Sequence, residues 1–183
     1  MRLLDQIKVP IRQELADFEP YFRKTMQSDI PLLSTILDYI YRTKGKQIRP
    51  MFVFLSAAML GKANELTQVA ACSVEWLHTA TLVHDDVVDE SYERRGFFSV
   101  NALWRNKLAV LVGDYILAQG LLLQLKHEQY GYLQLISGAV QDMSEGEILQ
   151  IRKSRKLDID SDTYYDIIRK KTASLIATSL AIG

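Results

Sequence analysis

The sequence predicts an all-α fold, built as a bundle of long and mostly antiparallel helices. Its 183 residues contain only 4 prolines and 9 glycines, which leaves long uninterrupted windows. Within those windows the apolar residues recur at helical spacing, and no stretch shows convincing strand alternation. The length predicts a single helical domain over 1–183, with enough residues for a sizeable core.

Three shorter helices are expected first. The first helical region lies within 3–26 and should break or kink at Pro10 and Pro20, because proline has no backbone N–H to donate. The second runs over about 31–43 and the third over about 49–61. Both begin beside a proline, which suits a first helical turn, and the third stops at a glycine.

Longer helices follow in the second part of the chain. The fourth spans about 65–90, the fifth about 108–128 and the sixth about 132–153. A polar loop then leads to a last helix that is capped by Asp160 or Ser161. That helix is still apolar where the sequence stops, so we expect a truncated domain whose C-terminal helices are missing.

The charge composition narrows the classes of partner that this chain could bind. The 22 basic and 22 acidic residues cancel, which argues against nucleic acid or an anionic membrane surface. The N-terminus has no apolar signal core, and we expect no apolar stretch long enough and free enough of charge to span a membrane. The single cysteine, Cys72, is expected in the core of a cytoplasmic protein, because it has no disulfide partner within the chain.

An aspartate cluster with the sequence Asp-Asp-Val-Val-Asp occupies 85–89. On a helix of about 100° per residue, Asp85 and Asp89 share one stripe with His78, whereas Asp86 is turned from His78 by roughly 80°. Carboxylates this close repel one another unless a cation binds between them. Hard oxygen ligands with open positions suit Mg²⁺, which takes its remaining ligands from substrate phosphates. A solvated acidic helix end is the alternative interpretation.

Two basic segments could supply an anion site beside this cluster. Lys46 and Arg49 lie at the expected start of the third helix, where free backbone N–H groups also favour anions. Arg94 and Arg95 begin five residues after the cluster, which lets their loop fold back toward a metal. A carboxylate–metal centre between two basic loops is what binding of a diphosphate requires. Each basic residue alone is equally compatible with a solvated surface charge.

Six segments, in this order, resemble the trans-type polyprenyl (isoprenyl) diphosphate synthases, specifically the N-terminal portion of the long-chain, octaprenyl-like members. They are Gly45-Lys46-Gln47-Ile48-Arg49-Pro50, Leu82-Val83-His84-Asp85-Asp86-Val87-Val88-Asp89, Arg94-Arg95-Gly96, Leu111-Val112-Gly113-Asp114-Tyr115, Glu145-Gly146-Glu147-Ile148-Leu149-Gln150 and Lys171-Thr172-Ala173-Ser174-Leu175. The resemblance implies an isoprenoid synthase fold and a prenyltransferase. It also implies Mg²⁺-dependent condensation of isopentenyl diphosphate onto an allylic diphosphate, usually by a homodimer.

The same resemblance implies roles for single residues. Asp85 and Asp89 would ligate Mg²⁺ with Asp86 in support, and these three with Arg94 and Lys171 would form the catalytic set. The implied substrate ligands are Arg94, Lys171, Thr172 and Gln150 for the allylic diphosphate and Lys46, Arg49, His78 and Arg95 for isopentenyl diphosphate. In such enzymes a large aromatic residue just before the first aspartate blocks the elongation pocket.

Ala80 and Thr81, the fifth and fourth residues before Asp85, are both small. By the resemblance, small residues at these two positions predict an open elongation pocket and therefore a long polyprenyl product. Ala80 could instead pack against a neighbouring helix, and Leu117 or Leu121 deeper in the pocket could stop elongation.

The sequence departs from the family pattern at two points. Gln47 stands where many members have arginine, and the family's second aspartate-rich motif does not occur within the 183 residues. The run Asp-Ile-Asp-Ser-Asp at 158–162 is interpreted as a solvated loop and helix cap. We therefore expect this chain alone to be inactive or nearly so.

Three other interpretations stay open. The chain could be a non-catalytic subunit or an inactive fragment of such a synthase. A terpene cyclase or squalene-type synthase shares a helical fold and an acidic motif, but the two basic segments favour a second diphosphate. An HD-type phosphohydrolase could use His84 with Asp85, although the chain has only three histidines.

Overall fold

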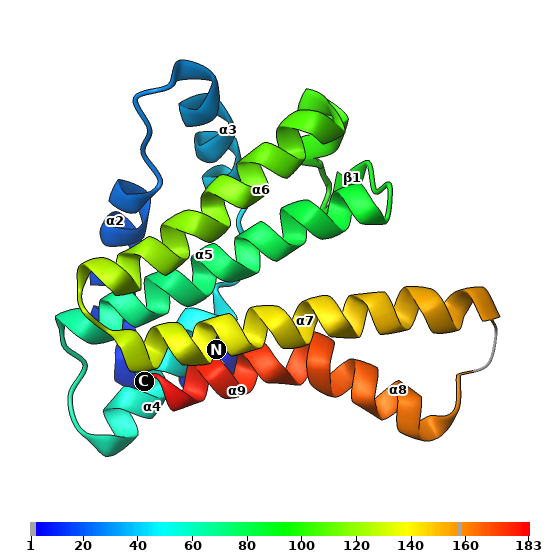
Figure 1. Cartoon of the computed structure of the whole chain (residues 1–183). Coiled ribbons are helices and arrows are strands. Elements are labelled where there is room, and N and C mark those ends of the chain that lie inside the picture. Colours follow the sequence, from blue (N-terminus) through cyan, green and yellow to red (C-terminus); the bar gives the residue numbers. More distant parts are fainter. Residues whose placement is uncertain (1–2, 157–158) are drawn as a thin grey trace.

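The computed structural model describes residues 3–156 and 159–183, and nearly all of them lie in helices (Figure 1). This confirms the predicted all-α class. The elements in chain order are α1 (Leu3–Ile7), η1 (Val9–Ile11), α2 (Arg12–Thr25), α3 (Pro31–Arg42), α4 (Ile48–Leu60), α5 (Glu65–Val88), β1 (Glu93–Arg94), β2 (Phe97–Phe98), α6 (Val100–Lys126), α7 (Tyr130–Lys156), α8 (Ser161–Ile168), η2 (Arg169–Ala173) and α9 (Ser174–Ala181).

Two antiparallel helix pairs dominate the arrangement. Figure 1 shows α6 returning alongside α5, and α8, η2 and α9 returning alongside α7. α4 packs against both pairs, because it contacts α5 and α9. The shorter N-terminal helices cover the other side of α5 and α6, through α2 and α3 respectively.

The close contact between α5 and α6 depends on small and polar residues at their interface. A Cβ added to Gly120 of α6 would lie 3.1 Å from the Trp76 Cβ and 3.3 Å from the Ser73 carbonyl oxygen, so this glycine lets the two backbones approach. Buried Gln124 donates to the Ser73 hydroxyl at 2.9 Å. Trp76 in turn donates to the Thr25 hydroxyl at 3.0 Å, which ties α2 to the same buried layer.

The ends of α5 are well defined by the sequence. Asn64 and Thr67 form a capping box, in which each side chain accepts a 3.1 Å hydrogen bond from the other residue's backbone N–H. The helix ends at Val88, and Asp89 is its C-cap residue. The aspartate cluster therefore sits across the carboxyl end of α5, two residues short of the predicted end.

Two predicted features of the helices were wrong. Pro20 lies inside α2, and the helix continues across it without a break. Because proline has no N–H, the Ala16 carbonyl loses its helical hydrogen bond. Both residues are exposed to solvent. The fifth helix starts at Val100 rather than near 108, and the Ser99 hydroxyl caps it. Its first turns contain polar residues and an irregular Arg105 with φ 67° and ψ 160°, which hid the helical pattern.

The expectation that no stretch is long and apolar enough to span a membrane was also wrong. By length and composition α6 is sufficient to cross one. In the structure this helix packs along α5, and its buried residues include Ala109, Val112 and Ile116.

Cys72 lies in the core, as predicted, with its side chain fully buried in α5. Its Sγ is 3.3 Å from the Thr25 hydroxyl oxygen. Burial raises the pKa of this thiol to about 12, so it stays protonated near neutral pH.

Candidate active site

Two cavities lie along neighbouring faces of the C-terminal half of α5. The larger cavity, of about 400 Å³, lies between α5, α7 and η2, and its polar lining includes Arg49, His78, Thr81, Asp85, Glu147, Lys171 and Thr172. The smaller cavity, of about 70 Å³, lies between α3, α5 and the β1–β2 hairpin, and its polar lining includes Lys44, Glu75, His78, Asp86, Arg94 and Arg95. His78 borders both cavities.

The larger cavity brings together groups that are far apart in sequence. Asp85 of α5 faces Glu147 of α7 and Lys171 of η2 across it. Burial raises the pKa of Asp85, and the negative charges of Glu147 and Asp89 raise it further, whereas Lys171 lowers it. Burial and two neighbouring carboxylates thus disfavour the charged form of Asp85, and a cation bound beside it would offset this effect.

A glycine and a π-helical turn aim Lys171 into the larger cavity. A Cβ on Gly146 of α7 would lie 2.9 Å from the Lys170 Cβ and 3.2 Å from the Lys171 backbone nitrogen, so only glycine allows this approach of α7 and η2. The Lys171 Nζ forms an ion pair with Glu147 and a 3.2 Å hydrogen bond to Gln150 Oε1.

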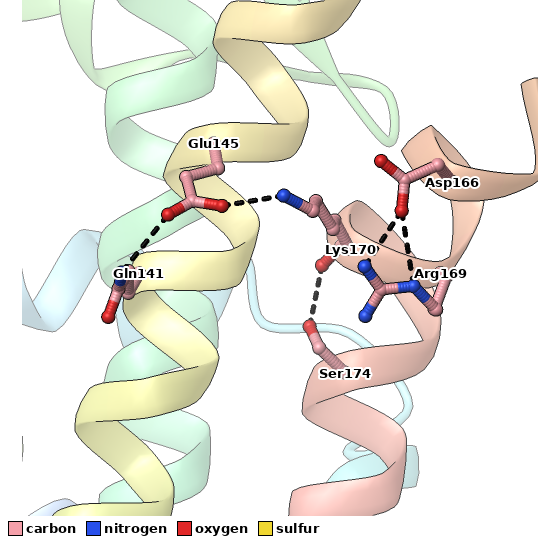
Figure 2. Close-up of polar contacts among 6 residues, drawn as sticks. All are labelled: Gln141, Glu145, Asp166, Arg169, Lys170 and Ser174. Carbon is pink, nitrogen blue, oxygen red and sulfur yellow. Dashed lines mark hydrogen bonds and ion pairs between the residues drawn. The ribbon is translucent and has the colours of Figure 1, made fainter. Parts of the chain in front are cut away.

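The neighbouring Lys170 makes different contacts, which Figure 2 shows. Its Nζ lies 2.6 Å from Glu145 Oε2 on the outer side of α7. The Ser174 hydroxyl donates to the Lys170 carbonyl at 2.6 Å, and Arg169 pairs with Asp166 at 2.7 Å. These contacts join η2 to α7 and α9 and leave Lys171 for the cavity.

Asp86 is committed to a buried ion pair. Its side chain is only 6% exposed, and Oδ1 accepts from Arg94 Nε at 2.8 Å and Nη2 at 2.7 Å. The Asp86 carbonyl accepts from Asn101 Nδ2 at 3.1 Å. The hydrogen bond with Asp86 raises the pKa of Arg94. Asp86 thus fixes the hairpin against α5 and α6.

The hairpin folds an arginine back over the loop before α4. Its two-residue turn consists of Arg95 at φ 57° and Gly96 at φ 80°, as a type I′ turn requires. A Cβ on Gly45 would overlap the Arg95 guanidinium, so this glycine makes room for it. The two basic segments therefore meet, as their spacing to the aspartate cluster suggested.

The ionisation of the buried groups here differs from that of free side chains. Burial, followed by the charges of Arg49, Arg95 and Arg94, lowers the pKa of His78 to about 3. His78 is therefore neutral near pH 7 and can offer a hydrogen bond but no charge. Burial raises the pKa of Glu75 to about 7, although Arg49, Arg95 and Lys44 act in the opposite direction.

The remaining predicted residues occupy different environments. Thr172 is exposed on the larger cavity, Gln150 contacts Lys171, and Lys46 and Asp89 are exposed and line neither cavity. Thr81 lines the larger cavity, whereas Ala80 is buried in the core.

Two of the arginines border different cavities. Arg49 borders the larger cavity and Arg94 the smaller one. Sequence reasoning gave no role to Glu75 or Glu147. A charged residue within the apolar run of α5 was the one available signal for Glu75.

His84 does not form a pair with Asp85. Its Nε2 lies 3.3 Å from Asp114 Oδ1 and 3.4 Å from the Val110 carbonyl oxygen on α6. Its ring fills the space that the absent side chain of Gly113 leaves. His84 still lines the larger cavity, but these contacts hold its ring against α6.

Two of the described carboxylates could hold a metal ion from one side. Asp85 and Asp89 are one helical turn apart and offer the hard oxygen ligands that suit Mg²⁺. Among residues 3–156 and 159–183, no three His, Cys, Asp or Glu side chains group closely enough to hold a metal ion by themselves. Asp160 caps α8 by accepting from the Thr163 backbone N–H at 2.7 Å, as predicted, while Asp158 lies outside the described residues.

Known proteins share this arrangement. A family model described as polyprenyl synthetase matches residues 30–183. The all-trans-nonaprenyl-diphosphate synthase (geranyl-diphosphate specific) of Rhodobacter capsulatus is 36% identical over 170 residues, which are 92% of this chain and 52% of the relative. The octaprenyl diphosphate synthase of Escherichia coli K12 is 36% identical over 94% of this chain and 53% of its own length.

Solved structures agree with these relatives. The polyprenyl synthase of Caulobacter crescentus CB15, complexed with calcium and isoprenyl diphosphate, superposes with a TM-score of 0.92 at 32% identity, covering 97% of this chain and 54% of that one. A decaprenyl diphosphate synthase from Rhodobacter capsulatus gives 0.91 at 34% identity, covering 96% and 55%. The chain spans about half the length of these relatives. By sequence and by fold, it belongs to the polyprenyl synthetase family.

Proposed function

We propose that the chain is the N-terminal, substrate-binding portion of a long-chain trans-polyprenyl diphosphate synthase. The observation that carries this proposal is the rim of the larger cavity, where Asp85, Arg49 and Lys171 converge from three separate elements. Binding of a diphosphate substrate requires carboxylates that ligate a metal ion and, beside them, basic side chains that contact the phosphate oxygens. The long-chain synthases among the relatives support the same conclusion.

Asp85 and Asp89 would hold Mg²⁺, which supplies charge neutralisation of the diphosphate leaving group. Lys171 would exchange its contacts with Glu147 and Gln150 for phosphate oxygens as the allylic diphosphate binds. Thr172 is next to it on the same rim. The apolar part of the cavity would keep water away from the electron-poor carbon that remains after the C–O bond breaks.

Isopentenyl diphosphate would bind beside neutral His78, which borders both cavities and can offer a hydrogen bond, with Arg49 from the larger cavity, Arg95 from the smaller one, and Lys46. Arg94 would act mainly by orienting the hairpin through Asp86. Thr81, rather than Ala80, would set the depth of the elongation pocket, because Thr81 lines the larger cavity.

Binding to the 183 residues tests the proposal directly. We expect isopentenyl diphosphate to bind, and a non-cleavable allylic diphosphate analogue to bind more tightly with Mg²⁺ than without it. Asp85→Asn should remove the Mg²⁺ effect, whereas Asp142→Asn on exposed α7 should not. Failure of both diphosphates to bind at millimolar concentration would rule the proposal out.

Turnover distinguishes the alternatives. We expect little prenyl transfer from the 183 residues alone, since the described carboxylates form one side of a metal site. Incorporation of radiolabelled isopentenyl diphosphate by a longer form would support a synthase over a cyclase. Activity that requires mixing with a second, different chain would instead indicate a non-catalytic subunit.

Self-association in the cytoplasm is part of the same proposal. α6 exposes apolar side chains at Leu103, Val110, Leu111, Leu122 and Leu125, a surface that a second copy could cover. Light scattering should give twice the monomer mass, and Leu111→Asp should reduce it.

A further inference from the structure

The middle of α5 contains a buried carboxylate with no assigned task. Glu75 is only 5% exposed, and it lies between Val74 and Trp76, which are fully or almost fully buried. Within the described residues, its Oε2 is buried and has no hydrogen-bond partner. A buried and unpaired carboxylate oxygen is costly, so its retention here calls for a specific interaction.

Glu75 lies near cations from three segments of the chain. Arg49 comes from α4, Arg95 from the hairpin and Lys44 from the loop before α4; the charges of all three act on Glu75. The opposing acidic neighbour is Glu19 of α2, which is held by Lys44. His78, one turn further along α5, is neutral.

These cations are not saturated by the protein. Within the part of the chain that the structure describes, Arg49 Nε is buried without a hydrogen-bond partner. Arg95 rests on the backbone of Gly45 beside the smaller cavity, which Glu75 and His78 also line. Arg49 therefore has a donor that the protein leaves unsatisfied, and both arginines border a cavity in which an anion could bind.

We propose that Glu75 is a positioning residue that takes up a proton from solvent when a diphosphate binds to Arg49 and Arg95. Without substrate, the positive charges of Arg49, Arg95 and Lys44 favour the ionised carboxylate, whose negative charge acts on Arg49 against the repulsion from Arg95. A bound diphosphate brings several negative charges close to Glu75 and occupies those cations, so the carboxylate becomes the neutral acid. Its carbonyl oxygen can still accept from an arginine, so the site keeps its shape.

The free protein is poised for this change. Its Glu75 pKa of about 7 means that the ionised and neutral forms coexist near neutrality, and added negative charge raises a carboxyl pKa further. Binding should then be linked to proton uptake between about pH 6 and 8. The inference rests on the proposed function in one respect, because it takes Arg49 and Arg95 as ligands of isopentenyl diphosphate.

Calorimetric titration of the 183-residue chain with isopentenyl diphosphate, in two buffers of different protonation enthalpy, measures the protons exchanged. We expect wild type to take up more protons at pH 7 than Glu75→Gln, which has the same shape and no titrating group. From pH 7 to pH 8, the wild-type Kd should rise by up to about tenfold more than that of Glu75→Gln. Glu65→Gln, exposed at the start of the same helix, should match wild type.

A second measurement uses the wild type alone, so its result does not depend on whether the Glu75→Gln variant folds. The side-chain carboxyl ¹³C resonance of Glu75, followed by NMR against pH, should titrate at higher pH with isopentenyl diphosphate than without. Inorganic pyrophosphate should produce the same direction of shift. An unchanged titration, or equal proton uptake by wild type and Glu75→Gln, overturns the inference while leaving the proposed function intact. Absence of binding by wild type overturns both.

Discussion

The two faces of α5 differ in how far their charges are already arranged. On the hairpin face, Asp86 holds Arg94 through two hydrogen bonds to one oxygen, and Gly45 seats Arg95. On the face toward α7, Lys171 pairs with Glu147, a partner that a substrate phosphate would have to replace. Under the proposed function, the first face would need no rearrangement to bind a diphosphate, whereas the second would have to exchange contacts.

The strongest test of this contrast is removal of the fixed pair. Asp86→Ala leaves Arg94 partly buried without its partner, so the free energy of unfolding should fall by about 3 kcal/mol. Urea denaturation measures the change. Asp166→Ala removes an exposed pair with Arg169 and should cost less than about 1 kcal/mol. Equal losses in the two variants would show that the hairpin is not held by Asp86.

Next in size is the pH dependence that Glu75 confers on the hairpin face. Its pKa is raised from 4.5 to about 7, so the folded chain binds this proton more tightly than the unfolded chain does. The stabilising contribution is complete below about pH 4.5 and is lost as the pH rises through 7.

Between pH 5 and 8 wild type should therefore lose about 2 kcal/mol relative to Glu75→Gln. Urea unfolding of both proteins at the two pH values checks the sign. A constant difference between them would mean that Glu75 does not titrate in this range.

A smaller effect is expected where α7 meets η2. Gly146→Ala places a methyl group against Lys170 and the Lys171 backbone, which should reduce stability by about 1–2 kcal/mol. It should also weaken binding of the allylic analogue by displacing Lys171. Gly138→Ala on the same helix meets no atom within 4 Å and should stabilise slightly, because alanine favours helix. Unchanged analogue binding in Gly146→Ala would separate Lys171 from the substrate.

The smallest effect on stability is expected at Thr81, one of the two small residues before Asp85. Thr81→Phe extends into the larger cavity and should cost under about 1.5 kcal/mol while shortening the product of a longer, active form. Ala80→Phe forces a ring into the core and should destabilise the fold by about 1–3 kcal/mol. Chromatography of extracted polyprenols reports product length. A shorter product from Ala80→Phe alone would restore the original assignment of Ala80.

Local sequence signals were enough to predict most helices, but not to predict which cavity each arginine borders. Apolar spacing located α5, and the 64–67 capping box agrees with its start. The early start of α6 escaped notice because its first turns are polar and Arg105 breaks the regular geometry. The spacing of Arg94 from Asp89 indicated that its loop folds back toward the aspartates, but which cavity Arg49 or Arg94 borders depends on tertiary packing.

The π-helical turn η2 accommodates one residue more than a regular α-helix would. Ile167 and Leu175 are both buried although they are eight residues apart, a spacing that an α-helix would turn by about 80°. Deleting one residue within 169–173 would place them seven apart, within about 20°, and keep both in the core. The extra residue is therefore not needed to bury α8 and α9. Around this turn, two adjacent lysines contact different carboxylates of α7, Lys170 contacting Glu145 and Lys171 contacting Glu147.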